Sequence, residues 1–168
     1  YVKQLFNHLE TIYEGCFLLR ELTPKTLAKV SSFGELLSSY IIAKAANTIF
    51  ETVYKDSREL IVASNNYNNA VVDFTATNKK CQEYFKSHTQ KVTILPGFVA
   101  RTIDGKTTTL GRGGSDYTAA ILAAALAADE LQIWTDVSGM YTANPKIVKQ
   151  ASEIAHISYH EAMELSHF

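Results

Sequence analysis

Residues 107–120 carry the sequence Thr-Thr-Thr-Leu-Gly-Arg-Gly-Gly-Ser-Asp-Tyr-Thr-Ala-Ala, which predicts a strand, a glycine-rich loop and a helix in succession. The three glycines let backbone amides turn towards one point without obstruction by side chains. The N-terminus of the helix adds unpaired N–H groups and the positive end of the helix dipole. Arg112 adds a planar guanidinium that can bind an anion through two hydrogen bonds. Together these features predict a site for a carboxylate or a phosphate.

The same loop also has a purely structural interpretation, in which it is a tight turn and Ser115 or Asp116 only caps the helix. The loop matches neither the GxxxxGK[ST] nor the GxGxxG phosphate-binding pattern. A carboxylate such as that of Asp116 is costly beside bound phosphates unless a cation neutralises it. Spacing alone leaves both interpretations open, and Asp116 can serve in both.

A second informative segment is residues 134–146, Trp-Thr-Asp-Val-Ser-Gly-Met-Tyr-Thr-Ala-Asn-Pro-Lys. A predicted buried strand at 131–135 ends at Thr135 and Asp136, and ligands of open α/β sheets gather at the carboxyl ends of strands. Tyr141 could pack on a base, and Lys146 could reach phosphates. The alternative is a surface turn with a packed tyrosine.

Hydrophobic periodicity across the rest of the chain predicts helices that alternate with short apolar strands, and therefore an α/β layered sheet. Asp104-Gly105 predicts a hairpin between the alternating runs 98–103 and 106–110. The helix 116–128 is apolar nearly all round, which predicts burial. The asparagine-rich residues 65–69 are expected to form a polar loop without chemistry. The expected helices are 2–22 with a break at Gly15, 24–50 in two pieces joined near Gly34, 78–88, 116–128 and 158–168; the expected strands are 52–54, 60–62, 70–74, 91–95 and 131–135, with Trp134 in the core.

The composition of the chain argues against nucleic acids and membranes as binding partners. The chain has 168 residues, 16 Lys and Arg against 17 Asp and Glu, so it lacks the basic excess of nucleic-acid-binding proteins. Its longest apolar run, 119–128, is far shorter than the ~20 residues that span a membrane.

Cys16 and Cys81 have no metal-ligand spacing and indicate reduced thiols in the cytoplasm. A capping box from Ser158 to Glu161 argues against a metal site at the neighbouring histidines, so no protein-bound metal is predicted.

The two informative segments together resemble the amino acid kinase superfamily, and specifically the aspartate kinases. The segment TDVSGMYTANPK is similar to the nucleotide loop of the superfamily, and TTTLGRGGSDYTAA is similar to the aspartate kinase signature. The segments ELTPKT, SSFGELLSS, PGFVA and HISYHEAMELSHF occur in the same order. The resemblance implies a three-layer α/β/α sandwich around a mainly parallel sheet. It also implies that residues 1–168 are the central part of the kinase domain, incomplete at both ends, without the N-terminal phosphate loop or the C-terminal ACT domains.

What the resemblance implies about function is transfer of the γ-phosphoryl group of MgATP to the side-chain carboxylate of L-aspartate, the first step towards lysine, threonine and methionine. Mg²⁺ would be bound through the nucleotide phosphates, and the protein would be a homodimer. Asn144 and Lys146 depart from the Asp and Arg usual in the family, so the phosphate contact at Lys146 is expected to be weaker. The implied residues are Asp116 and Arg112 for catalysis; Glu35 for the substrate ammonium; Arg112, Gly113, Gly114 and Ser115 for the rest of the substrate; and Thr135, Asp136, Tyr141 and Lys146 for ATP.

Two alternatives stay open at this point. One is a related kinase that forms an acyl phosphate on glutamate or N-acetylglutamate, although such relatives carry other residues in the glycine loop. The other is a non-catalytic, ligand-sensing module of the same fold. Because the phosphate loop with the family's catalytic lysine is not in this sequence, residues 1–168 are predicted to be inactive alone.

Overall fold

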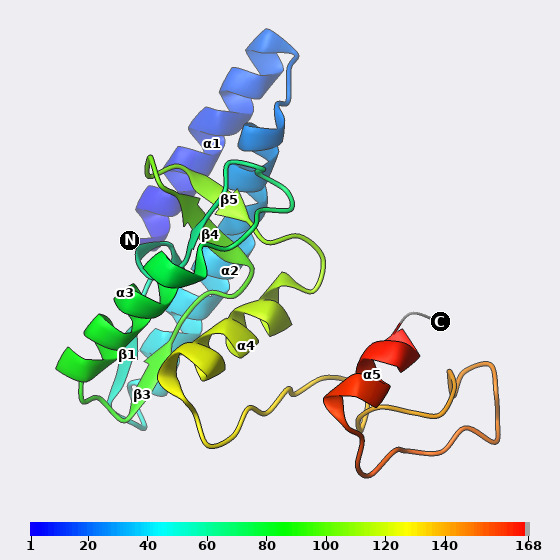
Figure 1. The fold of residues 1–168 in the computed structure, drawn as a ribbon. Coiled ribbons are helices and arrows are strands. Elements are labelled where there is room, and N and C mark those ends of the chain that lie inside the picture. The colour runs from blue at the N-terminus through cyan, green and yellow to red at the C-terminus, as the bar shows by residue number, and fades with distance from the viewer. Residues whose placement is uncertain (167–168) are drawn as a thin grey trace. The chain divides into compact units, whose positions relative to one another are not determined.

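The computed structural model describes residues 1–166 and combines helices with parallel strands, which confirms the α/β fold class (Figure 1). The chain forms two compact units. The first unit is Tyr1–Leu131, and the second begins at Gln132. Each unit is described by itself below.

The first unit opens with a pair of helices, α1 (Val2–Leu19) and α2 (Pro24–Ala46). α2 begins where the sequence predicts, because Thr23 caps it by accepting a hydrogen bond from the Thr26 amide at 3.2 Å. The predicted breaks at Gly15 and Gly34 are wrong, since both helices run through these residues. One glycine costs a helix only about 1 kcal/mol, which is too little to interrupt a periodic apolar face.

The strands form two small sheets. β1 (Thr52–Tyr54) pairs in parallel with β3 (Val92–Ile94). In the second sheet, β2 (Val62–Ala63) pairs in parallel with β4 (Val99–Thr102), and β4 pairs with β5 (Thr107–Thr109). The last pair is antiparallel, which confirms the predicted hairpin, and Gly105 occupies its turn with a φ of +81°.

Two predicted elements differ from the structure. Residues 70–74 form no strand, because Asp73 caps α3 (Phe74–Ser87) by accepting a hydrogen bond from the Ala76 amide at 3.0 Å. What remains of the expected strand is one bridge between Val72 and Ala63. The strand predicted at 60–62 is displaced towards its end, because a short helix, η1 (Ser57–Glu59), precedes β2.

The strands lie between two groups of helices. α2 contacts β1, β3 and β5, whereas α3 packs against α4 (Gly114–Leu126). The main core cluster joins β2 and β4 to these last two helices through Ala63, Ala100, Cys81 and Ile121. α4 buries only part of its surface, although its sequence is apolar nearly all round. This packing fixes the start of α4 against the sheet.

The second unit contains α5 (Tyr159–Ser166) and a bridge between Tyr141 and Glu153. The predicted capping box is confirmed, because the Ser158 hydroxyl and amide both donate to the Glu161 carboxylate, at 2.7 and 2.9 Å. The last two residues of the helix predicted at 158–168 lie outside the described residues.

The strand predicted at 131–135 is wrong, and so is the prediction that Trp134 belongs to the core. The segment has no regular structure, and Trp134 is 89% exposed. A strand forms only where a neighbouring strand accepts its hydrogen bonds, and no strand of the described chain pairs with this segment.

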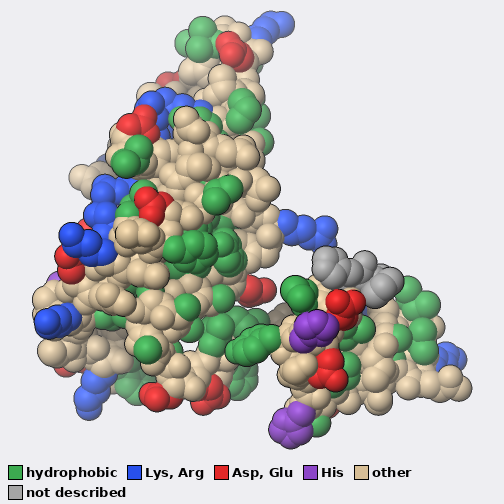
Figure 2. Space-filling model, viewed as in Figure 1, with side chains coloured by type: hydrophobic (Ala, Val, Ile, Leu, Met, Phe, Trp, Pro, Cys, Tyr) green, Lys and Arg blue, Asp and Glu red, His purple; other side chains and the backbone are tan. Residues whose placement is uncertain are grey.

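The surface carries charges of both signs. On the face drawn in Figure 2, Lys and Arg side chains alternate with Asp and Glu side chains along one edge of the first unit. Within residues 1–166, no helix is both long and apolar enough to cross a membrane.

Candidate functional site

The glycine loop between β5 and α4 has the conformation that its sequence requires. Gly111 and Gly113 have φ values of +81° and +71°, in the left-handed region that favours glycine. Gly113 occupies the N-cap position of α4, and no side chain caps the helix. The interpretation of Ser115 or Asp116 as the cap is therefore wrong, and α4 begins two residues earlier than predicted, at Gly114.

Backbone donors are left over at this end of α4. The Gly114 amide donates to the Gly111 carbonyl at 3.1 Å, and the Tyr117 amide donates to the Gly113 carbonyl at 3.0 Å. Among the described residues, the amides of Ser115 and Asp116 have no backbone acceptor. These two amides and the helix dipole favour an anion beside Ser115.

A groove of about 420 Å³ lies in front of this helix start. It brings together two residues that the sequence singled out, Glu35 from α2 and Ser115 from α4. Glu35 is half-buried, and no described side chain pairs with its carboxylate. The groove therefore offers a negative group on one wall and a helix N-terminus on the other. The remaining lining residues are Thr93, Ile94, Leu95, Gly97, Thr118, Ala119 and Leu122.

The other residues predicted for the substrate lie in the same loop but outside the lining of the groove. Gly114 is buried beneath Phe98, and a Cβ atom on Gly114 would come within 2.8 Å of the Phe98 ring. Arg112, Gly113 and Asp116 are exposed. The structure thus places Arg112 and Asp116 on the surface near the groove, and their assigned roles remain predictions.

Sequence reasoning missed the contribution of Gly97 to the groove. A Cβ atom on Gly97 would lie 2.9 Å from the Cα, Cβ and Oγ atoms of Ser115, so the two segments are in close contact. The Thr118 hydroxyl accepts a hydrogen bond from the Phe98 amide at 3.0 Å. The Pro96-Gly97 pair, one residue after the end of β3, was the available signal, but it predicts only a turn.

The asparagine-rich loop also has a part in the site. The Tyr67 carbonyl accepts hydrogen bonds from the amide and the hydroxyl of Thr109, both at 2.9 Å. Asn69 packs against Gly111, where a Cβ atom would lie 2.9 Å from the Asn69 Oδ1. The loop supports the glycine turn that precedes Arg112, a role that its composition did not indicate.

The residues predicted to bind the nucleotide all belong to the second unit. Thr135 and Asp136 are exposed, and the Thr135 hydroxyl donates to Asp136 Oδ1 at 3.2 Å. The Tyr141 hydroxyl donates to Glu153 Oε1 at 2.9 Å, which fixes the ring. Lys146 is exposed, and its amide donates to Asn144 Oδ1 at 3.0 Å. Thr135, Asp136 and Lys146 are therefore accessible to a ligand, and the half-buried Tyr141 is held in place by Glu153.

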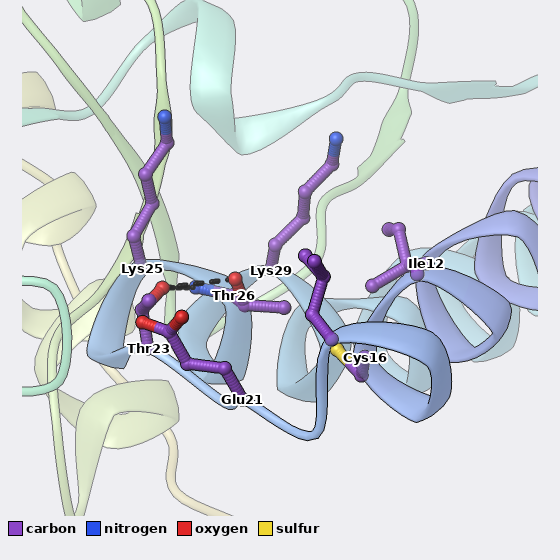
Figure 3. A pocket seen from close by; sticks show the side chains of 9 residues that line it. Ile12, Cys16, Glu21, Thr23, Lys25, Thr26 and Lys29 are labelled. Carbon is purple, nitrogen blue, oxygen red and sulfur yellow. Dashed lines mark hydrogen bonds between the residues drawn. The ribbon is translucent and has the colours of Figure 1, made fainter.

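A different hollow, of about 340 Å³, lies between α1 and α2 and is drawn in Figure 3. Lys25 and Lys29 extend from α2 in the same direction, away from Cys16. The hydroxyls of Thr23 and Thr26, which also line the hollow, hydrogen-bond to each other at 2.9 Å. None of the residues singled out for chemistry lines this hollow.

The two cysteines, Cys16 and Cys81, lie in the first unit. Both cysteines are free, and burial raises the pKa of the Cys81 thiol, which disfavours the reactive thiolate. Within residues 1–166, no three His, Cys, Asp or Glu side chains come together as metal ligands.

Comparison with known proteins adds independent findings. The sequence pattern of the Amino acid kinase family matches residues 6–168. The chain is 37% identical over 169 residues to the bifunctional aspartokinase/homoserine dehydrogenase of Buchnera aphidicola, covering 99% of this chain and 21% of that protein. It is also 37% identical over 144 residues to the aspartokinase of Helicobacter pylori, covering 84% of this chain and 35% of the relative. The chain therefore spans about a fifth to a third of the length of these relatives.

A solved structure with a similar fold is that of Escherichia coli aspartokinase III in complex with aspartate and ADP, in the R-state. It superimposes with a TM-score of 0.90 at 32% sequence identity, over 99% of this chain and 37% of that chain. The resemblance to aspartate kinases that the sequence indicates is confirmed by these relatives.

Proposed function

Because the chain belongs to the amino acid kinase family, we propose that it is part of an aspartate kinase. The enzyme would transfer the γ-phosphoryl group of MgATP to the side-chain carboxylate of L-aspartate, giving 4-phospho-L-aspartate for lysine, threonine and methionine synthesis. The observation that carries the proposal is the groove between the Glu35 side chain and the start of α4. The aspartokinase III structure, which holds aspartate and ADP, supports it.

The groove has the charge pattern that an amino acid requires. Glu35 can bind the substrate ammonium, because its carboxylate has no cationic partner among the described residues. The free amides at the start of α4 and the exposed guanidinium of Arg112 can bind a substrate carboxylate. In this arrangement Ser115 forms part of the groove wall, and Gly113 and Gly114 form the turn directly before it.

Phosphoryl transfer of this kind depends mainly on positioning and on charge neutralisation. An oxygen of the aspartate side chain forms a bond to the γ-phosphorus, the bond from that phosphorus to the bridging oxygen breaks, and ADP leaves. Asp116 would organise the reacting groups. Mg²⁺, which prefers phosphate oxygens and water to a protein cage, would neutralise the phosphates as they react. ATP would be held by Thr135, Asp136, Tyr141 and Lys146.

The structure bears on one of the two departures from the family pattern, the asparagine at position 144. Asn144 Oδ1 accepts the Lys146 amide, a turn that an aspartate at this position could form equally well. The replacement therefore keeps the turn and removes one negative charge. Lys146 is a point charge rather than a planar fork, so its contact with phosphate is expected to be weaker than that of an arginine.

The test is ADP release from MgATP by the full-length gene product, with the acyl phosphate trapped by hydroxylamine. L-Aspartate is compared with L-glutamate and N-acetyl-L-glutamate as acceptors. We expect release with aspartate alone. We expect Arg112→Ala and Asp116→Ala to lower kcat/KM for aspartate by at least about a hundredfold, because both remove charge at the reacting groups. Asp129→Ala, just beyond the C-terminal end of α4, is the matched control and should leave the kinetics unchanged.

Release with another acceptor would replace aspartate by that acceptor. No release with any acceptor from a folded protein would favour a ligand-sensing module. Residues 1–168 alone should show no turnover. Gel filtration of the full-length protein tests the proposed homodimer, and a cytoplasmic location stays a prediction.

A further inference from the structure

The hydroxyl of Thr118 joins two segments that are far apart in the sequence. It accepts a hydrogen bond from the Phe98 amide at 3.0 Å and donates one to the Gly114 carbonyl at 2.7 Å. Thr118 is 3% exposed, and burial strengthens such hydrogen bonds. The bond to Gly114, four residues earlier in α4, is common for a helical threonine, whereas the bond to Phe98 is specific to this fold.

The residue held by this bond has an unfavourable backbone conformation. Phe98 has a φ of 66°, in the left-handed region that bulky side chains avoid. Such a conformation persists only where the surroundings enforce it. Both peptide groups of Phe98 are bound, the amide to Thr118 and the carbonyl to the Leu110 amide at 2.9 Å.

Two further close contacts hold the Phe98 turn near the start of α4. Gly97 faces Ser115 and Gly114 faces Phe98, and at each glycine a Cβ atom would come within 2.9 Å of the facing residue. Gly97, Ser115 and Thr118 all line the same groove as Glu35. The spacing between Phe98 and the start of α4 therefore sets the shape of one end of the groove.

We propose that Thr118 is a positioning residue for the amino acid substrate: its hydroxyl holds the Phe98 turn against the start of α4, so that Ser115 and its free amide keep a fixed distance from the Glu35 wall. The inference rests on the proposed function only in taking the groove as the substrate site. Thr118 touches no reacting atom in this scheme and acts through the two segments that it joins.

The chain offers a matched control for this residue. Thr77 on α3 is also fully buried, and its hydroxyl accepts from the Val62 amide at 3.1 Å and donates to the Val62 carbonyl at 3.3 Å. It therefore ties a helix to a backbone segment in the same way, but it does not line the groove. Thr→Val removes the hydroxyl at either position with little change of shape.

The experiment measures kcat and both KM values for the full-length protein and its variants. We expect Thr118→Val to raise KM for aspartate on the order of tenfold or more, since small displacements at a substrate site are costly. KM for ATP should change by less than about twofold, because the residues proposed to hold ATP belong to the second unit and not to the segments that Thr118 joins. Thr118→Ser keeps the hydroxyl and should restore the wild-type values. Equal effects of Thr118→Val and Thr77→Val on KM for aspartate would overturn the proposal.

A second measurement separates this inference from the proposed function. Hydrogen exchange of a peptide that contains Phe98 should be faster in Thr118→Val than in Thr118→Ser. Thr118→Ala is a second variant without the hydroxyl, for use if the valine variant folds poorly, and its exchange should also be faster than that of Thr118→Ser. Equal protection in all three would overturn the proposal even for an active enzyme. If wild-type protein uses another acceptor, the proposed function fails, and the same comparison of KM values is made with that acceptor. A folded wild-type protein without any acceptor would overturn both.

Discussion

Replacing Gly97 by alanine should destabilise the first unit through a single steric contact. The Cβ atom would lie 2.9 Å from three atoms of Ser115, one of them the Cα atom in the first turn of α4. The φ of Gly97 lies outside the left-handed region, so an alanine fits the backbone and only the contact is unfavourable. Inserting an atom into such a packed position costs about 1–3 kcal/mol.

The same substitution at Gly34 is expected to have the opposite sign. Gly34 lies within α2, and a Cβ atom there would meet nothing within 4 Å. Alanine in the interior of a helix is more stable than glycine by roughly 0.5–1 kcal/mol. The two variants add the same methyl group, so opposite signs would distinguish the contact with Ser115 from the general effect of replacing glycine by alanine.

Native-state hydrogen exchange is the suitable assay, because it reports the free energy of opening for peptides of one unit. Peptides from β4 and α4 should lose protection in Gly97→Ala, and peptides from α2 should gain it in Gly34→Ala. The reasoning is refuted if Gly97→Ala leaves β4 and α4 as protected as in the wild type, because the turn and the helix would then not be in close contact.

Two further predictions concern a helix end and a histidine. Ala127 caps α4 with a φ of 48°, so Ala127→Gly should stabilise the protein by about 1 kcal/mol in thermal unfolding, whereas Ala124→Gly within the helix should destabilise it by a similar amount. Burial, and then the charges of Lys29 and Arg58, lower the pKa of His8, so the unfolded chain takes up the proton first as the pH falls below about 6.5. The contribution of His8 to stability is therefore complete above that pH and is lost on acidification. In His8→Gln, the melting temperature should fall less steeply between about pH 7 and pH 5 than in the wild type. An unchanged slope would contradict this prediction.

The elements that the sequence predicts correctly are those that local chemistry determines. The Thr23 cap, the Asp104-Gly105 hairpin and the Ser158–Glu161 capping box each depend on residues within a few positions of one another. The strand predicted at 131–135 fails for the converse reason. Its apolar run indicates burial, but a strand also needs a partner at a distance in the sequence, and none of the described strands supplies one.

The site shows the same division between local and distant interactions. The glycine loop could be recognised because Gly111 and Gly113 adopt conformations that glycine alone favours. The contributions of Gly97 and Thr118 could not be, because each depends on a contact about twenty residues away along the chain. A sequence pattern identifies the backbone donors of such a site but not the packing that keeps them in place.

The continuity of α2 bears directly on the proposed role of Glu35. If the helix broke at Gly34, Glu35 would stand in the first turn of a new helix, where its carboxylate would be stabilised by that helix's own amides and dipole. The observed helix runs from Pro24 to Ala46, so the amides around Glu35 are already bonded within it. The carboxylate is left facing the groove without a charged partner among the described residues. A half-buried carboxylate in that position gains most from a cation that arrives with the ligand, which is the property that an ammonium-binding residue needs.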